Sequence, residues 1–192
     1  MTEHAVFYYS AAAALAAGLA YRWLRARDGR ESPAADSQIA RFGENIKLRD
    51  LFRLAVMMEE EGTAFYLKMA ERVQNPGARK LCIQLAEEET EHRRLFQDRL
   101  NRWRSLAPNR LTWPAFLEKV RQEGLFNDQP GDGATEDEMA AFAIAQEKKT
   151  ADFYGLFEAA FPDAWKREKL KSLVEQELAH EAKLRAAYPH LR

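Results

Sequence analysis

The residues best suited to chemistry in this chain occur as two sets with the same spacing. Each set consists of a glutamate, a tyrosine seven positions later, and a Glu-x-x-His motif that begins 23 positions after the tyrosine. The second set follows the first at a constant offset of 88 residues, and the two sets are Glu59, Tyr66, Glu89 and His92, then Glu147, Tyr154, Glu177 and His180. Such a recurrence is difficult to obtain by chance. We interpret it as a duplicated helical hairpin that builds one metal site.

Four carboxylates and two imidazoles form a ligand set for a pair of divalent cations. Buried without cations in an apolar helical bundle, the carboxylates would be very costly, and two divalent ions would offset their four negative charges. Oxygen and nitrogen ligands without a thiolate suit iron, or manganese, better than a structural zinc ion. The alternative is that each Glu-x-x-His lies on a helix surface, which is common for a single copy. The predicted ligands are Glu59, Glu89, His92, Glu147, Glu177 and His180.

Four long helices are predicted to position these residues. Apolar side chains recur at helical spacing, Asn75-Pro76-Gly77 interrupts the first run, and Thr135 with Glu138 forms a capping box that opens a later one. Pro162 stands where the last helix can start. The expected helices cover about residues 46–73, 78–104, 135–160 and 162–187.

The segment between the second and third helices is predicted to be a long connection. Residues 105–134 contain three prolines and three glycines, with one short helical stretch at about 115–123. Two tight hairpins joined by one long crossover define an all-α, ferritin-like four-helix bundle. Each Glu of the pattern lies 14 to 16 residues from its hairpin turn. At about 1.5 Å per residue, antiparallel packing brings the ligands level near the middle of the bundle.

The residues around the pattern resemble a known family. The strings MEEEGTAFY and LAEEETEH in the first half, and QEKKTADFY and LVEQELAH in the second, resemble the di-iron domain of rubrerythrin-like members of the ferritin-like superfamily. The resemblance covers about residues 45–188. It implies two iron ions held by the six ligands, with Glu89 and Glu177 bridging, and it implies a homodimer. It also implies that Tyr66 and Tyr154 orient carboxylates by hydrogen bonding, the alternative being that they are core aromatics.

Two departures from the family pattern bear on function. A rubredoxin module needs four cysteines and the chain has only Cys82, so electrons are expected from another protein or from Fe(II) itself. Typical rubrerythrins carry a further carboxylate three residues after the third-helix glutamate, where this chain has Thr150. The expected site is therefore a symmetric one with six ligands, without the redox-linked ligand exchange of typical rubrerythrins.

The predicted site is compatible with several functions. The favoured one is reaction of a di-iron centre with H2O2 or O2, as a peroxidase or as a ferroxidase. A membrane-associated hydroxylase of a quinone-type ring substrate is an alternative, and a non-catalytic, membrane-tethered iron-binding protein is another.

Glutamates beside the predicted ligands are expected to lie on a solvated face. Their counterparts across the 88-residue repeat are not acidic, which argues against a ligand role. These pairs are Glu60 and Lys148, Glu61 and Lys149, and Glu88 and Gln176.

The first 27 residues differ from the rest of the chain. No charged residue occurs between positions 5 and 21, and arginines follow at 22, 25, 27 and 30. The uncharged stretch predicts a membrane anchor over residues 1–27, followed by a linker over 28–44. By the positive-inside rule, the arginines that follow the stretch place the domain over residues 45–188 in the cytoplasm. The alternatives are a helix that packs on a partner through Ser10, Ala14 and Gly18, a cleaved signal, and a soluble cytoplasmic protein. A net charge of -1 argues against a nucleic-acid partner.

Overall fold

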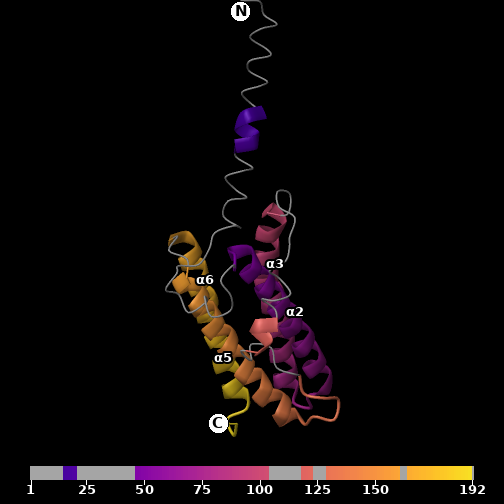
Figure 1. The fold of residues 1–192 in the computed structure, drawn as a ribbon. Coiled ribbons are helices and arrows are strands. Elements are labelled where there is room, and N and C mark those ends of the chain that lie inside the picture. The colour runs from indigo at the N-terminus through magenta and orange to yellow at the C-terminus, as the bar shows by residue number, and fades with distance from the viewer. Residues whose placement is uncertain (1–14, 21–45, 104–117, 123–128, 161–163, 192) are drawn as a thin grey trace, which may run out of the picture.

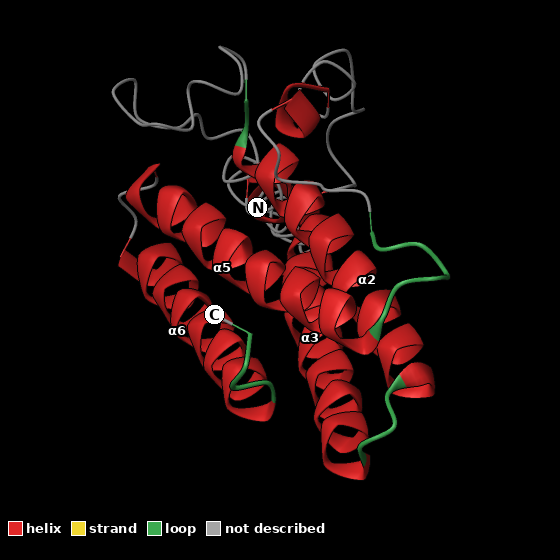
Figure 2. Cartoon of the chain, turned by 90° about the horizontal axis from the view of Figure 1, so that it is seen from below, coloured by secondary structure: helices red, strands yellow, loops and turns green. Residues whose placement is uncertain are grey.

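The computed structural model describes residues 15–20, 46–103, 118–122, 129–160 and 164–191. Four long helices account for most of these residues, and no strand occurs among them (Figures 1 and 2). The helices are α2 (Leu48–Arg72), α3 (Pro76–Trp103), α5 (Glu136–Ala160) and α6 (Ala164–Ala187). The all-helical prediction is confirmed.

Local capping explains where two of the helices begin. The Asn75 side chain accepts hydrogen bonds from the backbone N–H groups of Gly77, at 2.7 Å, and Ala78, at 3.3 Å. Asn75 is thus the N-cap of α3 and Pro76 its first residue, so α3 begins two residues earlier than predicted. At α5, Glu138 N–H donates to Thr135 Oγ1 at 3.2 Å, and Thr135 N–H donates to Glu138 Oε2 at 2.7 Å. This is the predicted capping box.

The helices pack as two hairpins, α2 with α3 and α5 with α6. In Figure 1, α2 and α6 run downward while α3 and α5 run upward, so the crossover returns the chain from the upper end of α3 to the lower end of α5. This is the predicted ferritin-like connectivity. Each helix packs extensively on its own hairpin partner, whereas the contacts between hairpins, α2 with α5 and α3 with α6, are few.

Part of the crossover belongs to the hydrophobic core. Residues 118–122 are helical, within the predicted stretch, and the rest of that stretch lies outside the described residues. Val120 is fully buried in a cluster that also contains Phe52 and Phe157. Residues 118–122 of the crossover therefore pack on the bundle, a packing role that the sequence analysis did not assign to them.

Two apolar clusters lie on either side of the middle of the bundle. The first is rich in aromatic rings, and Phe52 packs edge-on against Phe96 and Phe157 with centroid distances of 5.2 and 5.4 Å. The second combines aromatic rings such as Phe65 and Tyr188 with more small side chains, among them Cys82 and Ala140. The six predicted ligands lie in the helical segments between these clusters, so apolar side chains close the site from both ends.

Most of the N-terminal region lies outside the described residues. Residues 15–20 are helical and exposed, and the predicted linker over residues 28–44 is not described. Within the part of the chain that is described, no helix is both long enough and apolar enough to cross a membrane. The predicted anchor over residues 1–27 stays a prediction.

Candidate metal centre

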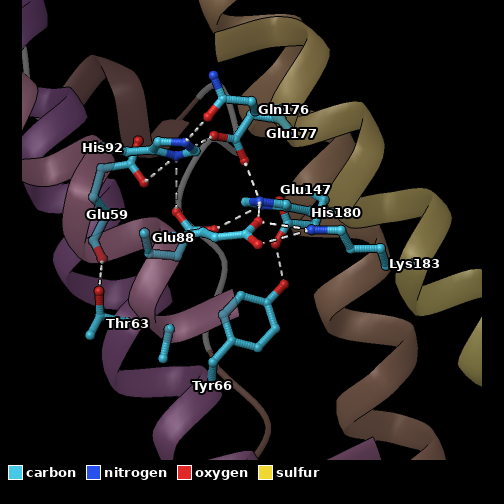
Figure 3. Close-up of polar contacts among 12 residues, drawn as sticks. Glu59, Thr63, Tyr66, Glu88, His92, Glu147, Gln176, Glu177, His180 and Lys183 are labelled. Carbon is cyan, nitrogen blue, oxygen red and sulfur yellow. Dashed lines mark hydrogen bonds and ion pairs between the residues drawn. The ribbon is translucent and has the colours of Figure 1, made fainter. Parts of the chain in front are cut away.

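The structure brings all six predicted ligands together in the interior of the bundle, and all of them except Glu89 are labelled in Figure 3. Their exposed fractions range from 1% to 5%. They form two overlapping groups, in each of which the candidate ligating atoms lie within 4.8 Å of one another. One group is Glu59, Glu89, His92 and Glu177, and the other is Glu89, Glu147, Glu177 and His180. Glu89 and Glu177 belong to both groups, which is the arrangement that bridging carboxylates require.

Helix geometry explains this convergence. Residues three apart share a face of a helix, so Glu89 and His92 point inward together from α3, as Glu177 and His180 do from α6. The other two helices supply one carboxylate each.

Each imidazole directs its Nδ1 atom at carboxylates from both hairpins. His92 Nδ1 lies 3.0 Å from Glu177 Oε1 and 3.8 Å from Glu59 Oε2. His180 Nδ1 lies 3.1 Å from Glu89 Oε1 and 3.4 Å from Glu147 Oε2. The shortest contact of each Nδ1 atom with a carboxylate is thus with the Glu-x-x-His motif of the other hairpin. The two rings stack with centroids 5.6 Å apart.

Several atoms at the centre lack a hydrogen bond. Among the described residues, His92 Nδ1, His180 Nδ1 and both carboxylate oxygens of Glu177 make no contact with the geometry of a hydrogen bond, although they lie within ion-pair distance of one another. Buried polar atoms are nearly always satisfied, so a concentrated group of exceptions needs an explanation. Lone pairs that converge in this way are satisfied by cations, and the donor set fits two of them.

The pKa values indicate which groups of the centre carry protons when no cation is bound. Burial raises the pKa of Glu59 and of Glu147 well above the usual range, which favours their protonated forms. Burial alone would lower the pKa of His180, but contacts with Glu147, Glu177 and Glu89 outweigh it and raise that pKa to about 12. The pKa of His92 is raised by carboxylate contacts in the same way. Without metal, the cluster thus retains protons that cations would displace.

The two tyrosines link the hairpins reciprocally. The Tyr66 hydroxyl on α2 donates a hydrogen bond to Glu147 Oε1 on α5, and the Tyr154 hydroxyl on α5 donates one to Glu59 Oε1 on α2. Both side chains are buried, and burial raises both phenol pKa values well above 10, so the hydroxyls stay protonated. Each tyrosine therefore fixes one oxygen of a carboxylate, whose other oxygen, Oε2, faces a histidine.

The outer nitrogen of each histidine has a partner that the sequence analysis missed. His180 Nε2 lies 2.6 Å from Glu88 Oε2, and His92 Nε2 lies 2.8 Å from Gln176 Oε1. The expectation of a purely solvated Glu88 is wrong, since its side chain is only 33% exposed and also binds Lys183 at 2.9 Å. A signal was present, because both positions immediately precede a Glu-x-x-His motif and both carry a hydrogen-bond acceptor. Glu60, by contrast, is exposed and pairs with Arg93 at 3.3 Å.

A small cavity reaches the carboxylates from the side of α2 and α5. Its volume is about 50 Å³, and its lining includes Glu59, Glu89, Glu147 and Glu177. Gly62 and Thr150, which correspond across the repeat, also line it. A Cβ atom on Gly62 would lie 3.5 Å from Glu89 Cγ, so glycine leaves space beside the Glu89 side chain. The cavity has room for a few water-sized molecules, since one water needs only about 10 to 15 Å³.

Fold and centre together define a class: a ferritin-like four-helix bundle whose interior carries two overlapping Glu/His groups suited to a binuclear metal site. Comparison with protein families gives the more specific result. The rubrerythrin family model matches residues 50–188, and the chain belongs to the rubrerythrin family. Comparisons with curated proteins and with solved structures gave no match.

Proposed function

We propose that this protein is a di-iron oxidoreductase that reduces a small oxidant, H2O2 or O2, with electrons from a donor protein or from Fe(II). The proposed ligands are Glu59, Glu89, His92, Glu147, Glu177 and His180, with manganese as the alternative metal. Bound as Fe(II), the two ions would supply the two electrons that, with two protons, reduce H2O2 to two water molecules.

The observation that carries the proposal is the cavity of about 50 Å³ that ends on all four carboxylates. It is large enough for H2O2 or O2 and faces the side of the centre that lacks the histidines. The protein's own groups prepare this site. Tyr66 and Tyr154 fix the carboxylates of Glu147 and Glu59, and the two apolar clusters exclude bulk water from both ends.

The size of the cavity disfavours the hydroxylase alternative. A cavity that binds benzene has a volume of about 150 Å³, roughly three times the space beside the carboxylates. A wider groove of about 590 Å³ opens between α3 and α6, but it reaches His92 and Gln176, and none of the four carboxylates lines it. A quinone-type ring bound there would meet the outer edge of an imidazole and not the inner face of the centre.

Rapid mixing tests the reaction. The anaerobic, iron-loaded protein is mixed with H2O2 and, separately, with O2, and oxidation is followed by absorbance. A rate with H2O2 at least tenfold above that with O2 identifies a peroxidase. A faster reaction with O2, with turnover of added Fe(II), identifies a ferroxidase. Oxidation by neither reagent contradicts the proposal, and Glu89→Ala/Glu177→Ala serves as the inactive control.

Three further features are proposed from the sequence. Residues 1–27 attach the protein to a membrane with the helical domain on the cytoplasmic side, and the chain forms a homodimer. Fractionation of cells that express the full chain or residues 28–192 tests the attachment, and recovery of the full chain in the soluble fraction contradicts it. Analytical ultracentrifugation tests the dimer.

A further inference from the structure

The environments of the two histidines differ although their positions in the repeat are equivalent. His180 Nε2 faces the carboxylate of Glu88, whereas His92 Nε2 faces the amide of Gln176 (Figure 3). Glu88 and Gln176 are themselves related by the 88-residue offset. The two histidines thus have hydrogen-bond partners at matching positions but of different charge.

The surrounding contacts fix both partners in place. Gln176 Nε2 donates to the backbone oxygen of Ser172 at 3.1 Å and to its hydroxyl at 3.0 Å, which turns the amide oxygen toward His92. Glu88 accepts hydrogen bonds from Gln84 Nε2 at 2.7 Å and from Lys183 Nζ at 2.9 Å. Lys183 corresponds across the repeat to Leu95, so the position equivalent to Lys183 in the first hairpin is apolar.

These contacts determine which ring nitrogen carries the proton. An amide oxygen and a carboxylate oxygen only accept hydrogen bonds, so Nε2 of each histidine is the donor. Nδ1 of each ring, which faces the carboxylates, is then the nitrogen whose lone pair becomes available when a cation displaces its proton. Both imidazoles are thereby set up as ligands in the same tautomer.

A carboxylate acceptor has a stronger effect on an imidazole than an amide acceptor does. Hydrogen bonds to an ionised acceptor are roughly twice as strong as neutral ones, and a carboxylate behind a ligating histidine raises the basicity of the ligating nitrogen. Lys183 offsets part of the Glu88 charge, but it lies one contact further from the ring. His180 is therefore the stronger ligand of the two.

We propose that Glu88 makes the two metal positions inequivalent, so that the position with His180 binds a divalent cation more tightly than the position with His92. Glu88 acts as a positioning residue, through the imidazole and not by touching the metal. The inference rests on the proposed function only in that the six residues must bind metal.

Anaerobic titration with Co(II), followed by its visible absorption and by calorimetry, tests this inference. The wild-type protein is expected to bind two ions in two separate steps. Loss of an outer partner typically costs about 10- to 100-fold in metal affinity, so Glu88→Gln should weaken the tighter step by that factor and bring the two steps together. Gln176→Glu should instead tighten the weaker step.

The reciprocal exchange is the matched control. Glu88→Gln/Gln176→Glu carries the same total charge as the wild type and should again show two separate steps, with the tighter one now abolished by His92→Ala and retained in His180→Ala. Two equal steps in the wild type, or two unchanged steps in Glu88→Gln, would overturn the inference. Absence of any Co(II) binding by the wild type would instead refute the metal centre itself, so the two failures are distinguishable.

Discussion

The first hairpin, α2 and α3, and the second hairpin, α5 and α6, carry the same ligands and the same tyrosines but differ in what surrounds them. Gly62 of the first corresponds to Thr150 of the second, and Glu88 corresponds to Gln176. The packing differs too, since Phe52, a member of the first apolar cluster, corresponds to Ala140, a member of the second. The six ligands and the two tyrosines are thus duplicated, whereas several of the residues around them are not. The difference shows that a symmetric ligand set does not imply two identical metal positions.

The largest expected effect is loss of bound metal when the two glutamates common to both ligand groups are removed. Glu89 and Glu177 belong to both ligand groups, so Glu89→Ala/Glu177→Ala removes two ligands from each metal position. We expect metal content to fall from two ions to fewer than about one per chain, measured by elemental analysis after loading with Fe(II). Glu60→Ala removes a neighbouring exposed carboxylate and should retain both ions. Full occupancy in the double variant would refute the bridging role.

Metal removal should make thermal stability depend on pH. In the metal-free protein the pKa of His180 is about 12, above its unfolded value of about 6.5. The stability it contributes is fully present below about pH 6.5 and is lost as pH rises toward the folded pKa. The raised pKa values of Glu59 and Glu147 likewise make the metal-free protein less stable as pH rises above about 4.5.

Metal should stabilise the folded protein more at higher pH, because cations displace these protons and therefore bind more tightly as pH rises. We therefore expect the difference in Tm between metal-bound and metal-free protein to be larger at about pH 8 than at about pH 6. Calorimetric scans of both forms at the two pH values measure it. A metal-free Tm that increases over this range would contradict the assignment of raised pKa values.

Removing each of the two tyrosine hydrogen bonds tests whether the two hairpins contribute equally to stability. Tyr66→Phe and Tyr154→Phe each remove one hydrogen bond to a buried carboxylate. We expect each to lower the free energy of unfolding of the metal-free protein by about 1 to 3 kcal/mol. Urea denaturation measures this. Costs that differ by more than about 2 kcal/mol would show that the halves are unequal here as well.

The smallest expected effect concerns Gly62 and Thr150. Gly62→Ala places a Cβ in ordinary contact with Glu89 Cγ, at 3.5 Å, and replaces a glycine inside α2. Helix propensity favours alanine over glycine by up to about 1 kcal/mol, so stability should increase by that amount or less. The cavity narrows at the same time, so oxidation by H2O2 should slow. Thr150→Ser, which keeps the hydroxyl on the opposite wall, is the control. An unchanged oxidation rate in Gly62→Ala would show that H2O2 does not react through this cavity.

The helices and the convergence of the six residues could be predicted because they depend on local rules. Helical periodicity, the Thr135 cap and a constant repeat place Glu59 and its counterparts at one height without any knowledge of packing. The contact between Glu88 and His180 could not be derived in this way, because the two residues are 92 positions apart and meet only through the packing of α3 against α6. The burial of Val120 and the size of the cavity likewise depend on how side chains fill space between helices.

The reciprocal tyrosine hydrogen bonds have a consequence for folding kinetics. Each hairpin closes over a short sequence separation and can form early, whereas the Tyr66–Glu147 and Tyr154–Glu59 bonds span 81 and 95 positions and need both hairpins in place. Neither hairpin completes its own carboxylates, because each relies on a phenol from the other. Metal uptake is therefore expected to follow hairpin docking, and its rate in a refolding experiment would report the last step of assembly.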